Sequence, residues 1–324
     1  MTGQSIPLLR SWISLPLVLC AALSVTGGRA FASMQENTPP DAPFDGGMAL
    51  GDSLAAERID APVERPTTWH SMVTNVPGDI AGGSETVVSG PGLEVAGGVG
   101  LLTGLLMVTD RFTNHATQDI INRNPWMQST CSVFQYIGNG RTHLGIAAAF
   151  AAAGLIADDS RALRTASQTV EGLLATGIVV QALKHMTGRE SPAAASQAGG
   201  VWRFFPSFRS YIRNQPKYYS FPSGHIATTM TTVTIIAENY PEQEWIRPVG
   251  YGIVGLVGVS LVGVKYHWYS DLPVGIGLGY LFGKVIAHKD RPGDEAIGTL
   301  KSPALSVSPS IGPFGAGITL GLTL

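Results

Sequence analysis

The sequence has little charge and almost no cysteine. Lys, Arg, Asp and Glu make up 14% of the 324 residues, and the formal net charge is −2. Non-specific nucleic-acid binding needs an excess of positive charge, so this balance excludes it. The two cysteines are Cys20 and Cys131, and Cys20 lies in a segment that we expect to be removed. The remaining thiol cannot form an internal disulfide, so cysteine usage indicates no compartment.

Strand-like alternation is also lacking over most of the chain. Residues 93–289 instead carry six apolar segments of helical length, which predict an all-α, six-helix bundle. These segments are Val95–Thr109, Leu144–Ala157, Thr169–Leu183, Ile226–Ala237, Pro248–Val264 and Leu272–Ala287.

Long uncharged apolar runs are scarce within this bundle. A membrane-spanning helix needs about 20 apolar residues, with roughly 17 as a lower limit. Only the stretch between Arg247 and Lys265 reaches that limit. We therefore expect a soluble or surface-bound periplasmic bundle, with a membrane-embedded one as the alternative.

The amino terminus has the order of a secretory signal. Arg10 precedes the apolar run Trp12–Val25, and the small-residue site Ala30–Ala32 follows. This pattern predicts a signal peptide over residues 1–32 and a periplasmic or extracytoplasmic mature protein, with an uncleaved anchor helix as the alternative.

Two segments flank the bundle. Residues 33–92 are rich in Pro, Gly, Asp and Ser, which predicts an irregular, partly disordered leader. Residues 290–324 begin as a linker and end in an alternating stretch from Ile318 to Leu324, with Gly312-Pro313 upstream. That pattern predicts a β-hairpin-like tail, and a contact with an envelope partner is its functional interpretation.

Two clusters in the second half of the bundle suit an anion. Ser223 can cap the helix that Gly224 and His225 begin, leaving backbone N–H groups directed at a ligand. Gly224 adds no Cβ that would keep an anion away. Lys184 and Arg189 supply two positive charges, and arginine can hold two phosphate oxygens at once. These four residues, Lys184, Arg189, Ser223 and Gly224, are the predicted phosphate-binding residues.

A third cluster supplies a nucleophile. His267 precedes Asp271 by four residues, so the carboxylate can hold one imidazole nitrogen and leave a lone pair on the other. His225 can then protonate the departing oxygen. We predict His267, His225 and Asp271 as the catalytic residues, with no metal and no cofactor, and a bell-shaped pH profile.

These motifs resemble those of the type 2 phosphatidic acid phosphatase superfamily, which includes bacterial acid phosphatases, lipid phosphatases and vanadium haloperoxidases. Its pattern is Lys, six residues, Arg-Pro; then Pro-Ser-Gly-His; then Ser-Arg, five residues, His, three residues, Asp. The similarity covers roughly Leu93 to Lys289. It implies that His267 becomes phosphohistidine, that Asp271 orients it and that His225 is the general acid.

Two positions depart from this pattern, since Ser191 and Leu261 stand where the family has arginine. Loss of one such donor commonly lowers the rate by about 10²–10³-fold. Arg189 is the predicted replacement for the first, and Lys265 is the nearest candidate for the second, with three further arginines in the preceding loop. These are Arg203, Arg209 and Arg213.

The predicted function is hydrolysis of a phosphomonoester or lipid phosphate. The alternatives are a non-catalytic phosphate or lipid-phosphate binder of the envelope and a vanadate-dependent haloperoxidase in which His267 ligates vanadium. Aromatic residues flank the basic loop and are interpreted either as packing against the bundle or as contacts for an acyl or prenyl chain. They are Trp202, Phe204, Phe205, Phe208 and Tyr211.

Overall fold

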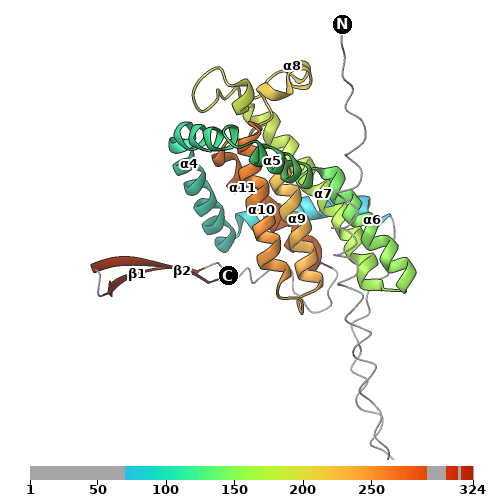
Figure 1. Cartoon of the computed structure of the whole chain (residues 1–324). Helices are drawn as coiled ribbons and strands as arrows, with labels where there is room; N and C mark the ends of the chain where they lie inside the picture. Colours follow the sequence, from blue (N-terminus) through green and yellow to red (C-terminus); the bar gives the residue numbers. More distant parts are fainter. Residues whose placement is uncertain (1–69, 290–303, 313–314, 324) are drawn as a thin grey trace, which may run out of the picture.

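The computed structural model of the chain describes residues 70–289, 304–312 and 315–323 (Figure 1). The predicted signal segment, most of the predicted leader and the linker after residue 289 lie outside these residues. Within them helices dominate, and the predicted all-α class is confirmed.

Ten α-helices form the described bundle, rather than the six predicted. They are α2 (Ser71–Thr74), α3 (Val76–Val88), α4 (Gly90–Asn122), α5 (Pro125–Ile137), α6 (Gly140–Ala157), α7 (Ser160–Thr187), α8 (Phe208–Arg213), α9 (Gly224–Asn239), α10 (Ile246–Gly263) and α11 (Leu272–His288). Single 3₁₀ turns lie between them, namely η1 (Pro192–Ala194), η2 (Gln215–Lys217) and η3 (Tyr269–Asp271). The six predicted segments fall in α4, α6, α7, α9, α10 and α11.

The predicted irregular leader is wrong for residues 76–88 and 90–92, which are helical. Glycines and Asp79 give α3 the composition of a loop, although a proline in its first turn is compatible with a helix start. Its Val76 and Ile80 belong to an apolar cluster with Phe282. Tertiary burial outweighs the low helix propensity of this segment.

Helix α9 lies at the centre of the bundle, against α7, α10 and α11. Close contact with α11 depends on small residues. A Cβ on Gly279 would lie 2.4 Å from the carbonyl oxygen of Ala227, so only glycine fits there. On its other side, α9 contributes Ile226 and Met230 to an apolar cluster with α10. The start of α9 is thereby held firmly between its neighbours.

Three described helices, α4, α6 and α10, are long and apolar enough to cross a membrane. Only 11% of the apolar window of α4 is buried, and Val108 and Phe112 are 84% and 78% exposed. Burial of such side chains in lipid is favourable, so these faces support membrane association over the predicted soluble bundle. Helix α4 was not predicted as a candidate span because Asp110 interrupts its uncharged run. Asp110 is fully buried in protein and is not on the exposed apolar face.

The predicted tail hairpin is confirmed. Strand β1 (Ala304–Gly312) pairs antiparallel with β2 (Gly315–Thr323), from Ala304 opposite Thr323 to Gly312 opposite Gly315 (Figure 1).

Candidate active site

The three predicted clusters meet at one end of the bundle. They come from the last turn of α7, the first turn of α9 and the loop that contains η3. The imidazole rings of His225 and His267 lie 6.3 Å apart, centroid to centroid, with their planes at 69°. Both rings can therefore face a single phosphoryl group.

His267 is buried and faces Asp271. Its Nδ1 lies 3.4 Å from Asp271 Oδ2, which also accepts hydrogen bonds from the Trp268 N–H at 2.8 Å and the Ser220 hydroxyl at 2.5 Å. These donors fix the carboxylate, and the carboxylate favours the tautomer with the proton on Nδ1. With the proton on Nδ1, the lone pair of the ring is on Nε2, the nitrogen that a nucleophile would use.

Burial sets the protonation states of this pair. It lowers the pKa of His267, and Asp271 opposes only part of that effect. Burial acts to raise the pKa of Asp271, but Arg189 and the hydrogen bonds from His267 and Ser220 hold this pKa below its usual value. The resulting state at neutral pH is a neutral imidazole beside a charged carboxylate, which suits a nucleophile.

The start of α9 has the predicted geometry of an anion site. Ser223 is the N-cap, and its Oγ accepts from the Ile226 N–H at 3.5 Å. A Cβ on Gly224 would lie 4.0 Å from Lys184 Nζ, so the Lys184 ammonium is adjacent to the first turn of α9. Burial lowers the pKa of Lys184 to about 8, while Asp271 acts in the opposite direction. Helix dipole and ammonium together favour an anion there.

His225 lies on the first turn of α9 and is half-buried. Burial, followed by the neighbouring His267, Lys184 and His143, lowers the pKa of His225 to about 3. A bound phosphoryl group adds negative charge beside the ring and raises this pKa, which a general acid requires.

Arg189 does not have the contacts predicted for it. Its side chain is only 2% exposed, and its two terminal nitrogens bind Asp271 Oδ1 at 2.6 Å and Asp110 Oδ2 at 2.7 Å. The guanidinium therefore lies behind Asp271, between two carboxylates, and does not line the space between the two histidines. Its partner Asp110 comes from α4, which the motif pattern leaves out.

Two other cations proposed to replace the family arginines show no contact with the anion site. Arg203 forms an ion pair with Glu190, and Lys265 is exposed with a left-handed backbone (φ 63°). Leu261, at the position of the second family arginine, is fully buried in the apolar cluster of α9 and α10. Lys184, in contrast, lies beside Gly224.

The aromatic loop divides into two groups. Tyr211 is buried against Tyr219, and Trp202 lies over the guanidinium of Arg189. In contrast, Phe204, Phe205 and Phe208 are 65–70% exposed. Phe204 stacks on Trp202 and Phe208 lies edge-on to His185 of α7, so packing accounts for only part of the surface of these side chains.

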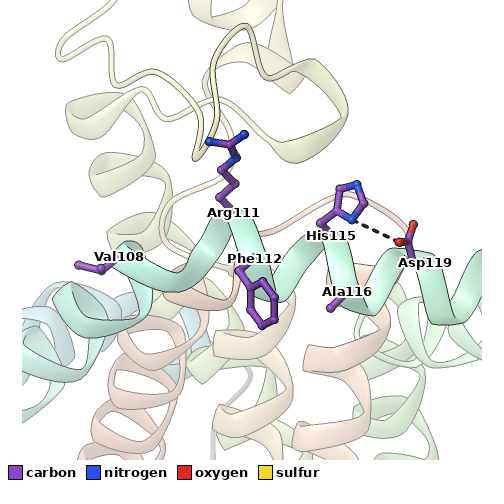
Figure 2. A pocket seen from close by; sticks show the side chains of 6 residues that line it. All are labelled: Val108, Arg111, Phe112, His115, Ala116 and Asp119. Carbon is purple, nitrogen blue, oxygen red and sulfur yellow. Dashed lines mark ion pairs between the residues drawn. The ribbon is translucent and has the colours of Figure 1, made fainter.

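A pocket lies on the surface of α4, lined by Val108, Arg111, Phe112, His115, Ala116 and Asp119 (Figure 2). Arg111 and His115 point to one side of the helix and Phe112 to the other, and His115 Nδ1 lies 3.3 Å from Asp119. None of the predicted site residues lines this pocket. Among the described residues, no group of three or more His, Cys, Asp or Glu side chains could hold a metal ion.

Comparison with known proteins agrees with the motifs. Residues 166–291 match the PAP2 superfamily. The chain is similar to the lipid A 1-phosphatase of Porphyromonas gingivalis, with 29% identity over 102 residues, and the match spans 28% of this chain and 23% of that protein. The resemblance to the type 2 phosphatidic acid phosphatase superfamily is thus confirmed over residues 166–291.

A solved structure gives a weaker likeness. It is the first transmembrane PAP2-type phosphatidylglycerolphosphate phosphatase from Bacillus subtilis, at 15% identity and a TM-score of 0.42. The superposition covers 67% of this chain and 94% of that one.

The motif pattern misses two residues of the site. Ser220 and Asp110 both reach the Arg189–Asp271 pair, and Asp110 lies outside the matched segment. An acid within an apolar helix is the sequence signal that indicates Asp110, because such a group is costly unless it is paired.

Proposed function

We propose that the chain is a membrane-associated phosphoric ester hydrolase that cleaves a lipid phosphate through a phosphohistidine on His267. The juxtaposition of His225 and His267, with Asp271 behind the second ring, carries this proposal. Lys184 and the start of α9 provide the adjacent anion site.

The reaction has two steps. Nε2 of His267 attacks phosphorus, the ester P–O bond breaks, and His225 gives its proton to the departing oxygen. Water then attacks the phosphohistidine, the P–N bond breaks, and His225 takes back a proton from that water. Inorganic phosphate leaves, and both histidines return to their starting states.

Three observations favour a lipid substrate over a soluble ester. The curated relative is described as a lipid A 1-phosphatase, α4 presents an apolar face, and the loop after the first motif exposes three phenylalanines. We propose the shared chemistry, a phosphate monoester on an apolar anchor, as the substrate class. An extracytoplasmic location is also proposed, on the signal-like residues 1–32.

The test is phosphate release from a lipid phosphate and a soluble aryl phosphate in detergent micelles with excess chelator. The wild type is expected to release phosphate from both and to prefer the lipid. His267→Ala should abolish turnover and the acid-labile phosphoenzyme that a rapid quench traps. The matched control is His115→Ala, an exposed histidine on α4 whose loss should leave activity unchanged. Absence of the phosphoenzyme from the active wild type would contradict the covalent route.

A non-catalytic lipid-phosphate binder is the second candidate, favoured by the burial of Leu261 and by the engagement of Arg189 with carboxylates. In that case the wild type binds a labelled lipid phosphate without hydrolysing it, and His267→Ala keeps most of the affinity. Turnover by the wild type would exclude this candidate.

A further inference from the structure

One face of α4 carries a polar stripe that contacts the segment containing His267 and Asp271. Asp110, Asn114 and Thr117 are spaced by four and three residues, so they lie on the same side of the helix. Asn114 Nδ2 donates to the backbone oxygen of His267 at 3.3 Å, and Thr117 Oγ1 lies 2.9 Å from the Tyr269 hydroxyl. Helix α4 therefore contacts the segment that contains the predicted nucleophile at several points.

Asp110 makes the most extensive of these contacts. It is fully buried, its Oδ1 accepts the Ser270 N–H at 3.1 Å, and its Oδ2 accepts the Ser270 hydroxyl and one nitrogen of Arg189. The other terminal nitrogen of Arg189 donates to Ser270 Oγ and to Asp271 Oδ1, both at 2.6 Å. A single cation is thus shared by two buried carboxylates.

This sharing affects His267 through charge. Arg189 competes with the imidazole for the negative charge of Asp271, because both lie against that carboxylate. Asp110 offsets the charge of Arg189 from the opposite side. Buried charges at such distances interact strongly, so removal of the Asp110 charge would leave Arg189 to attract Asp271 alone.

We propose that Asp110 is a positioning residue for the predicted nucleophile: through Arg189 and Ser270 it fixes η3 and keeps the Asp271 carboxylate available to His267. The inference rests on the proposed function. The charged and titratable groups that face His267 are Asp271, Lys184 and His225, with Arg189 and Asp110 behind Asp271.

The test reads the His267 ring directly, so its outcome does not depend on turnover. Full-length protein with ¹⁵N-labelled histidine is studied in detergent micelles, and His267→Gln assigns the His267 signals. In the wild type we expect Nδ1 protonated and Nε2 unprotonated at neutral pH. Asp110→Asn should move the Nδ1–H proton signal upfield, because Asp271 becomes a weaker acceptor.

Kinetics supply the second readout. Asp110→Asn is expected to lower kcat by about 10–100-fold, the usual cost of losing such a supporting contact, with little change in KM. Asp110→Glu keeps the charge and should recover part of the rate. Thr117→Val, on the same stripe but uncharged, should leave the Nδ1–H signal of His267 where it is in the wild type.

Two outcomes would overturn the inference: an unchanged His267 signal in folded Asp110→Asn, or an equal shift in Thr117→Val. If Asp110→Asn does not fold, the double variant Asp110→Asn/Arg189→Gln removes both charges together. It should show a His267 signal at or downfield of the wild-type position, and an upfield position would count against the proposal. An inactive wild type with the expected His267 shifts would contradict the hydrolase and leave the role of Asp110 supported.

Discussion

His225 and His267 come from different elements, the first turn of α9 and the loop before η3, yet their rings lie 6.3 Å apart at an angle of 69°. The two rings differ in their partners. His267 has a buried carboxylate behind it, whereas His225 has the neighbours His267 and Lys184 and lies edge-on to Tyr266. The Asp271 carboxylate orients the His267 ring as a nucleophile. His225 has no such partner, so a bound anion is needed to raise its pKa and keep it protonated. These different environments support the different roles proposed for two chemically identical side chains.

The role of His225 as general acid predicts a dependence on the leaving group. His225→Ala should lower kcat/KM for an alkyl phosphate by about 10²–10⁴-fold, the usual contribution of general acid catalysis. The loss should be far smaller for p-nitrophenyl phosphate, because nitrophenolate departs without a proton. Steady-state kinetics with both esters checks this, with His115→Ala as the control. Equal losses on both substrates would show that His225 acts in another way.

The low pKa of Lys184 predicts an alkaline limit to activity. Burial lowers this pKa to about 8, so the ammonium is charged below that pH and neutral above it. The free site should therefore bind phosphate well below pH 8, and kcat/KM should fall as pH rises through that value. A bound phosphoryl group stabilises the ammonium, so the limit in kcat should lie at a higher pH than the limit in kcat/KM.

Lys184→Arg tests this assignment, because arginine stays charged throughout the accessible range. Its alkaline limit should move to higher pH, even if the altered shape lowers the maximum rate. Lys217→Arg, an exposed lysine of η2, is the matched control and should leave the profile unchanged. A limit near pH 8 that persists in Lys184→Arg would assign it to another group.

The parts of the site that the sequence predicts are local ones. The cap at Ser223 follows from a short turn before a helix, and the proximity of His267 to Asp271 follows from their spacing. The role of Arg189 could not be predicted in this way, because it depends on Asp110 of a helix distant in the sequence. Helix α3 was missed for a similar reason, since its packing against Phe282 outweighs its own composition.

Gly224→Ala is predicted to weaken phosphate binding without lowering the stability of the protein. A Cβ at this position would be 3.4 Å from Val180 Cγ1 and 3.8 Å from Lys184 Cε, which are ordinary contacts, so Gly224→Ala should fold. Alanine is also a better helix former, so Tm should stay the same or rise. The added methyl occupies the space between the helix start and the ammonium, so KM should rise about tenfold, the equivalent of about 1.4 kcal/mol.

The control for this change is Gly140→Ala, at the first position of α6, where a Cβ would meet nothing within 4 Å. Thermal unfolding and inhibition by inorganic phosphate measure the two effects. An unaltered phosphate inhibition constant in Gly224→Ala would place the anion elsewhere.

The burial of Leu261 predicts that Leu261→Arg, which restores the family arginine, lowers the stability of the protein. The side chain is fully buried among Ile226, Met230, Val254 and Val257. Leu261→Arg would bury a charge in that cluster without a partner, which costs about 3–5 kcal/mol when a buried charge is left uncompensated. Tm should fall by about 6–20 °C for a domain of this size. Leu261→Met, which keeps volume and polarity, should leave Tm nearly unchanged.

The same variant separates two explanations of the departure from the family pattern. If the backbone around Leu261 can turn so that an arginine reaches the anion beside Gly224, Leu261→Arg should retain its Tm and bind phosphate more tightly. If the packing of α9 against α10 is fixed as described, stability and activity should both fall. We expect the second result, because Ile226, which belongs to the same apolar cluster as Leu261, directly follows His225 on α9. A strained cluster there would also displace His225, the proposed general acid.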